Sequence, residues 1–138
     1  MCFQVLEHVF DPVRFLDEIY RVLRPGGALL LSVPFVWDEH EQPYDYARYS
    51  SFGLRHLLAQ HGFEEARWVK TCTDARAPLQ LFNAYLYKLA QGRLTTIGAL
   101  CLTAPLNVAG LVAQHVLPAN PDLYLDNVVL ARRATAPA

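Results

Sequence analysis

The first 35 residues limit the fold of this chain more than any other part of the sequence. Apolar runs at 2–6 and 28–35 flank a segment that opens with Asp11-Pro12 and closes with Pro25-Gly26-Gly27. Asp is a favoured helix N-cap, and Pro fits the first helical position because its missing N–H needs no partner there. Pro and Gly then end a helix. The order strand, helix, strand predicts a βαβ unit with parallel strands and a right-handed crossover.

The second apolar run is continuous rather than alternating, which is typical of a strand in a sheet covered by helices. The sequence therefore predicts an α/β fold. Further along, we expect a helix that begins at Ser50 or Ser51 and ends at Gly62, with Leu54, Leu57 and Leu58 facing inward. The expected organisation is strand–helix–strand–loop–helix–strand over 1–70, an apolar helical insertion over 77–118, and a final strand over 122–133.

The composition is that of a folded protein, with 53% hydrophobic and 18% charged residues. This balance excludes disordered and low-complexity chains. The net charge is −1 and the basic residues are scattered, so we expect no nucleic-acid partner. The three cysteines show no CxxC spacing, so neither a disulfide framework nor a zinc knuckle is expected. A reducing, cytoplasmic location fits this cysteine usage best.

Two polar segments follow the two predicted parallel strands directly. Glu7-His8 follows the first strand, and the acidic and aromatic stretch 37–49 follows the second. The carboxyl ends of parallel strands share one rim of the sheet, and ligands of α/β proteins bind at that rim. We therefore expect both segments to lie together and to carry the chemistry.

Within the stretch 37–49, a His among carboxylates can act as a general base, and phenols and Arg can position a polar substrate. The alternative is a solvated lid loop in which Arg48 pairs with Asp45 or Glu41. A metal site made of Glu39, His40 and Glu41 is not expected, since three adjacent side chains cannot all point at one ion. No metal is expected anywhere in the chain.

Three sequence segments resemble the class I S-adenosylmethionine-dependent methyltransferases of the type 11 group. The string QVLEHVFDPVRFLDEIYRVLRPGGALLLSVPF is similar to the family's fourth strand, helix and fifth strand. The string HEQPYDYARYSSFGLRHLLAQHGF is similar to a segment of one subgroup, and LYLDNVVLARR looks like the antiparallel seventh strand. The resemblance implies the C-terminal portion of a Rossmann-like methyltransferase sheet, covering residues 2–70 strongly and 122–133 weakly.

The resemblance also implies a cofactor and site residues. S-adenosylmethionine would lie with its methionine end against Gln4, Glu7 and His8. His8 or His40 would serve as the catalytic base. The acceptor would be oriented by side chains of the loop: Trp37, Tyr44, Arg48 and Tyr49.

The family's glycine-rich loop, its ribose-binding acid and its adenine-contacting segment all precede the part that this sequence resembles. We therefore expect these 138 residues to bind the cofactor poorly and to be inactive alone. The predicted function is methyl transfer to a small-molecule or lipid-linked acceptor. One alternative is a non-catalytic remnant that acts as an interaction module, and another is a protein peripheral to the membrane that contacts its surface through 94–118. The apolar stretch 94–121 also fits ordinary core helices, helices that line a substrate channel, or a membrane span. Self-association through the unpaired first strand is also expected.

Overall fold

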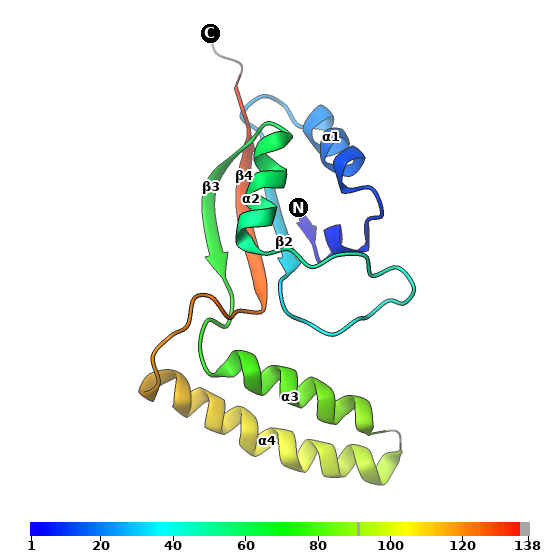
Figure 1. Ribbon diagram of the computed structural model, residues 1–138, viewed down its shortest axis with the longest axis vertical. Coiled ribbons are helices and arrows are strands. Elements are labelled where there is room, and N and C mark those ends of the chain that lie inside the picture. The colour runs from blue at the N-terminus through cyan, green and yellow to red at the C-terminus, as the bar shows by residue number, and fades with distance from the viewer. Residues whose placement is uncertain (91, 136–138) are drawn as a thin grey trace. The chain divides into compact units, whose positions relative to one another are not determined.

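The computed structural model describes residues 1–90 and 92–135 and divides into two compact units (Figure 1). Unit 1 consists of Met1–Thr71 and Asp126–Ala138, and unit 2 of Cys72–Leu125. Unit 1 holds every strand of the described residues. Its elements are β1 (Cys2–Phe3), the 3₁₀ helix η1 (Leu6–His8), α1 (Pro12–Val22), β2 (Ala28–Pro34), α2 (Ser51–Gln60), β3 (Phe63–Lys70) and β4 (Asp126–Arg133).

The four strands form one sheet in the order β1-β2-β4-β3. Strand β1 pairs with β2 in parallel, with Cys2 opposite Leu31, as the βαβ prediction requires. Strand β4 is antiparallel to both β2 and β3, so β3 runs in the direction of β1 and β2. The α/β class and the antiparallel final strand are confirmed.

The predicted helix limits are confirmed by their caps. The Asp11 side chain accepts a hydrogen bond from Arg14 N at 3.1 Å, and Pro12 occupies the first turn. After α1 the chain forms a turn in which Gly27 N donates to Arg24 O at 2.7 Å, and Gly26 has a φ of 73°. A positive φ at this position of a turn favours glycine, which explains the Pro-Gly-Gly stop.

The first strand is shorter than the predicted range of 2–6. It ends at Phe3 because Gln4 adopts a φ of 51°, which turns the chain out of the sheet and into η1. A left-handed backbone at a non-glycine residue is uncommon. The apolar run therefore divides between a two-residue strand and a buried turn at Leu6.

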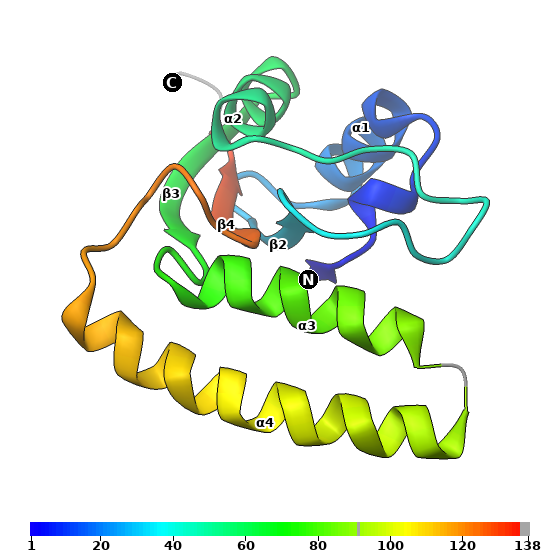
Figure 2. The same ribbon diagram turned by 60° about the horizontal axis from the view of Figure 1, so that its bottom comes forward.

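The core of unit 1 lies on one face of the sheet. Leu31 and Val33 of β2 and Val129 of β4 are fully buried on that face, together with Leu16 of α1 and Leu54 of α2. Figures 1 and 2 show α1 and α2 on this same face. The packing holds the carboxyl ends of β1 and β2 in place, and the candidate site is built there.

Unit 2 is a pair of helices, α3 (Arg76–Leu89) and α4 (Arg93–Val116), which confirms the helical character predicted for 77–118. The pair is joined by side-chain amides, since Asn83 Nδ2 donates to Asn107 Oδ1 at 2.8 Å. Residues Thr95–Val116 are long and apolar enough to cross a membrane by length and composition. This segment is mostly exposed within the described residues, with 11% of it buried.

Candidate active site

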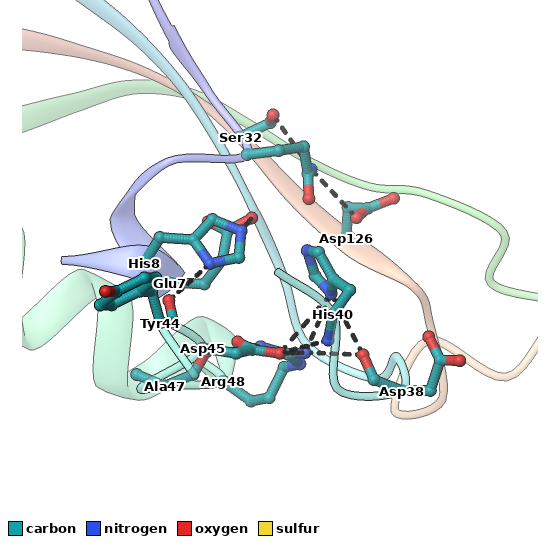
Figure 3. Close-up of polar contacts among 11 residues, drawn as sticks. Glu7, His8, Ser32, Asp38, His40, Tyr44, Asp45, Ala47, Arg48 and Asp126 are labelled. Atoms are coloured by element: carbon teal, nitrogen blue, oxygen red, sulfur yellow. Dashed lines mark hydrogen bonds and ion pairs between the residues drawn. The ribbon is translucent and has the colours of Figure 1, made fainter. Parts of the chain in front are cut away.

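The two polar segments that follow β1 and β2 meet at one rim of the sheet, as predicted. The carbonyl oxygen of Glu7 accepts hydrogen bonds from Tyr46 N at 2.8 Å and from Ala47 N at 3.2 Å. Tyr49 N donates to the carbonyl of Pro34, the last residue of β2, at 3.2 Å. These backbone bonds fasten the loop over 37–49 onto η1, so side chains from both segments face a common space (Figure 3).

Glu7 is fully buried, and neither of its carboxylate oxygens has a hydrogen-bond partner. One ionisable neighbour is His8, with 3.9 Å between Glu7 Oε1 and His8 Nε2. Burial raises the pKa of the Glu7 carboxyl, although the nearby His8, His40 and Arg48 partly oppose this effect. A buried acid with no partner is costly in free energy, and such groups gather at functional sites.

The two histidines lie against each other, with their ring centroids 4.8 Å apart and their planes perpendicular. His8 Nδ1 lies 2.8 Å from the carbonyl oxygen of Tyr44. A carbonyl can only accept, so this nitrogen carries the hydrogen and neutral His8 keeps the lone pair on Nε2. His40 Nδ1 lies 3.2 Å from the carbonyl of Asp38 and 3.5 Å from Asp45 Oδ2. These acceptors favour the same tautomer, although Arg48 Nη2 is also 3.5 Å from His40 Nδ1.

Arg48 connects several residues of the loop through hydrogen bonds from its guanidinium group. Its guanidinium donates to both carboxylate oxygens of Asp45, at 2.5 and 2.6 Å, and to the carbonyls of Asp38 and Ala47, each at 2.9 Å. Asp45 also accepts from His40 N at 3.0 Å. The Arg48 hydrogen bonds lower the pKa of the Asp45 carboxyl to about 2. The pairing of Arg48 with Asp45, one of the alternatives from the sequence, is thus present.

The other loop side chains named from the sequence lie in different surroundings. Trp37 is partly exposed and lines a cavity of about 200 Å³ together with Arg48 and Tyr46. Tyr44 contributes its carbonyl to His8, and its side chain is exposed. Tyr49 packs against the core, and burial raises the pKa of its phenol, as does the charge of Glu7. Their roles towards an acceptor stay predictions.

Gln4 faces the carboxyl edge of the sheet. Its amide nitrogen donates to Ser32 Oγ and to Asp126 Oδ1, each at 3.2 Å. These two partners come from β2 and β4, so Gln4 closes the rim beside β1. Its role as a cofactor contact stays a prediction.

Sequence reasoning missed Asn127. This residue is fully buried, donates to the carbonyl of Tyr49 at 2.8 Å and accepts from Trp68 Nε1 at 3.1 Å. It therefore anchors the end of the candidate loop to β3 and β4. An Asn inside an otherwise apolar strand was the available signal, since a buried amide needs partners.

His40 of the loop lies with a different acid from the two considered in the sequence analysis. Glu7, His8 and His40 each offer one ligand atom, and these atoms lie within 4.8 Å of one another. Glu39 and Glu41, the sequence neighbours of His40, are not part of this group. Among the described residues, it is the one cluster of this kind found.

Comparisons with known proteins support the resemblance. Residues 1–31 match the family described as "Methyltransferase domain". A probable S-adenosylmethionine-dependent methyltransferase of Mycolicibacterium smegmatis is 38% identical over 68 residues, which are 45% of this chain and 26% of that protein. An uncharacterized 37.1 kDa protein in a transposon of Streptomyces fradiae is 43% identical over 54 residues, which are 39% of this chain and 15% of that protein. The chain therefore spans about a quarter or less of these curated relatives.

Solved structures agree on the fold. The [4+2]-cyclase SpnF superposes with a TM-score of 0.53 at 20% identity, covering 98% of this chain and 48% of that one. The phosphoethanolamine N-methyltransferase 2 of Haemonchus contortus, in complex with S-adenosyl-L-methionine, superposes with a TM-score of 0.54 at 15% identity, covering 96% of this chain and 32% of that one. The chain therefore has a fold similar to that of the S-adenosylmethionine-dependent methyltransferases, and its residues 1–31 match the model of a methyltransferase family.

Proposed function

We propose that this chain takes part in methyl transfer from S-adenosylmethionine to a small-molecule acceptor. The observation that carries the proposal is the meeting of Glu7, His8 and His40 at the carboxyl rim of β1 and β2, within a segment that matches the methyltransferase family. The curated relative from Mycolicibacterium smegmatis and the Haemonchus contortus structure, which binds this cofactor, support it.

The reaction is an in-line displacement at a sulfonium, in which the acceptor's nucleophile bonds to the methyl carbon as the carbon–sulfur bond breaks. Positioning supplies much of the acceleration in such a step. A hydroxyl or ammonium acceptor must also lose a proton, and that proton needs a base within hydrogen-bond reach. His8 and His40 suit this role, because their Nδ1 atoms face acceptors and their Nε2 atoms are left to receive the proton.

The remaining residues divide between the two substrates. We assign Gln4, Glu7 and His8 to the methionine end of the cofactor, because they follow β1 directly. Trp37, Tyr44, Arg48 and Tyr49 would shape the acceptor side from the loop. For Arg48 this action is indirect: its hydrogen bonds to Asp45 and Asp38 hold His40 in place.

The test uses a version of the chain preceded by the glycine-rich half of a family member. In that protein, His8→Gln and His40→Gln should each reduce methyl transfer about 100-fold, a typical loss for a general base, while affinity for S-adenosylmethionine stays within a few fold. His56→Gln is the matched control, since His56 lies exposed on α2. Unchanged transfer in both site variants would contradict the assignment. A protein that binds neither cofactor nor acceptor would instead favour the non-catalytic interaction module.

We also propose that unit 2 contacts a membrane surface, so that the protein is cytoplasmic and peripheral, with a lipid-linked acceptor as one substrate class. The exposed apolar side chains of α4 support this, and the segment 94–118 carries no formally charged residue. These side chains include Ile97, Leu100, Leu102, Val108, Leu111 and Val112. Helices with this much exposed apolar surface are typical of membrane or protein contact.

Sedimentation with phospholipid vesicles tests the membrane contact. Leu100→Asp together with Leu111→Asp should abolish co-sedimentation, because charges on α4 would have to enter the lipid interface. Phe52→Asp is the control, since Phe52 is 77% exposed on α2 in unit 1. Equal sedimentation of all three proteins, or none for the unchanged chain, would contradict the contact.

A further inference from the structure

Glu7 is a buried acidic residue whose carboxyl group is not stabilised by any hydrogen bond in the structure. Its carboxylate is fully buried and both oxygens lack a hydrogen-bond partner. Arg48 lies close enough to act on Glu7 electrostatically, but it donates to Asp45 and to the carbonyls of Asp38 and Ala47 instead. Buried carboxylates in proteins are paired or bind metal, and both Glu7 oxygens are available as ligand atoms.

The two histidines beside Glu7 have the arrangement found in metal ligands. Ligating histidines almost always donate their second ring N–H to a carbonyl, a carboxylate or water, which fixes the tautomer and directs the other nitrogen at the ion. His8 donates from Nδ1 to the Tyr44 carbonyl, and His40 from Nδ1 towards the Asp38 carbonyl and the Asp45 carboxylate. Both therefore keep a lone pair on Nε2. In Figure 3, these two rings and the Glu7 carboxylate converge.

The distances are compatible with one ion after a small movement. The three ligand atoms lie within 4.8 Å of one another, and Glu7 Oε1 is 3.9 Å from His8 Nε2. Bonds of about 2.0–2.2 Å in a tetrahedral site place two ligands about 3.3 Å apart. A contraction of up to about 1.5 Å between ligand atoms, within reach of side-chain rotation, would therefore bring the group onto an ion.

We propose that Glu7, His8 and His40 bind one divalent first-row transition metal ion of the zinc type. This site was not expected from the sequence and goes beyond the proposed methyl transfer, since displacement at a sulfonium requires no metal. Two imidazoles and one carboxylate suit zinc-like ions rather than magnesium or calcium, which prefer oxygen ligands. Three protein ligands leave a fourth position open. Metal binding and proton acceptance by the histidines exclude each other, because both use the Nε2 lone pairs, so the base role belongs to the metal-free state.

Titration calorimetry of the 138-residue chain with ZnCl₂ tests the site, without S-adenosylmethionine or acceptor. The expected result is one Zn²⁺ per chain, and no heat with MgCl₂. Co²⁺ should replace Zn²⁺ and give the visible absorption of a tetrahedral site. Because neither substrate is present, failure of the metal site and failure of methyl transfer would be distinguished.

Variants locate the ion. Two single variants are made, Glu7→Gln, which keeps the shape of the buried side chain, and His40→Ala. Each should weaken Zn²⁺ binding at least about tenfold. His56→Ala on α2 should bind like the unchanged chain. Circular dichroism should show that all variants fold. If His40→Ala does not fold, His40→Gln takes its place in the binding measurement. Absence of Zn²⁺ binding by the unchanged chain would overturn the proposal, as would equal affinity in the Glu7 and His40 variants or loss of binding on changing His56.

Discussion

At the scale of residues, the side chains of Asp45 and Arg48 form the ion pair with the most hydrogen bonds in the site. The side chain of Asp45 is 4% exposed and accepts two hydrogen bonds from Arg48. It also holds the backbone of His40. The ion pair therefore stabilises the loop that presents His40, in addition to any part that Arg48 plays towards an acceptor.

The lowered pKa of Asp45 gives a pH dependence of stability. The carboxyl has a pKa of about 2 in the folded chain and an ordinary value of 3.8. A carboxyl whose pKa is lowered by folding stabilises the folded chain at pH values above the pKa of the unfolded chain. This stabilisation is lost as the pH falls through the pKa of the folded chain. The difference corresponds to about 2 kcal/mol. We expect urea unfolding of the unchanged chain to weaken by this amount between about pH 5 and pH 2, relative to Asp45→Asn. Parallel pH profiles of the two proteins would refute the coupling.

Asn127 should be as important to the fold of the rim as any apolar core residue. Replacing it with Ala leaves the Trp68 N–H and the Tyr49 carbonyl without their partner, and such a loss costs about 2–4 kcal/mol for two buried groups. Chemical denaturation would measure this loss of stability. Gln60→Ala at the exposed end of α2 is the control and should change stability by less than about 0.5 kcal/mol. A cost for Asn127→Ala no greater than for the control would contradict the anchoring role.

The residues of the site were only partly predictable from the sequence. Glu7, His8 and His40 could be assigned to one rim, because parallel strands require their ends to meet. The burial of Glu7 and the hydrogen bonds at each histidine Nδ1 could not be predicted, since they depend on the path of the loop and on the turn at Gln4. For the same reason, the proposed metal site was not expected, because its ligands include residues far apart in the sequence.

At the scale of elements, the helices and strands followed closely from caps and breakers. Asp11, Ser50 and the glycines at 26 and 62 mark boundaries that the structure confirms. The register shift in β3 between Glu65 and Arg67 had no sequence signal that we recognised. The early end of β1 was also missed, because an apolar run does not distinguish a strand from a buried turn.

Two glycines, one in the turn after α2 and one within α4, give a matched prediction about stability. Gly62 has a φ of 76°, and a Cβ there would lie 2.8 Å from the Tyr20 ring, so Gly62→Ala should destabilise unit 1 by about 1–3 kcal/mol. Gly98 lies within α4 with no atom within 4 Å of a Cβ, so Gly98→Ala should stabilise that helix by about 0.5–1 kcal/mol. Circular dichroism during urea unfolding compares the two. Equal effects would show that the turn after α2 tolerates a side chain.

At the scale of the whole molecule, the two compact units have separate tasks in this account. Unit 1 carries the rim with its acid, its histidines and its loop, and unit 2 carries the apolar helices. Within the described residues, β1 pairs with β2 and has no strand on its other side. An unpaired strand edge promotes association with another chain.

Self-association of the 138-residue chain is therefore expected. Light scattering should give a mass above that of one chain, which is 15.6 kDa. Preceding the chain with the glycine-rich half of a family member should restore a monomer by pairing β1. A monomeric 138-residue chain would contradict the role of the open edge.

We propose that the methyl group is transferred at the rim formed by η1 and the loop over 37–49. The most direct measurement is transfer of a tritiated methyl group from S-adenosylmethionine, by the version that carries the family's glycine-rich half, to a panel of small hydroxyl and amine acceptors. We expect the rate of transfer to fall about 100-fold in His8→Gln and in His40→Gln and to be unchanged in His56→Gln. Transfer that persists at full rate in both site variants, with cofactor affinity intact, would show that the two histidines do not act as bases at this rim.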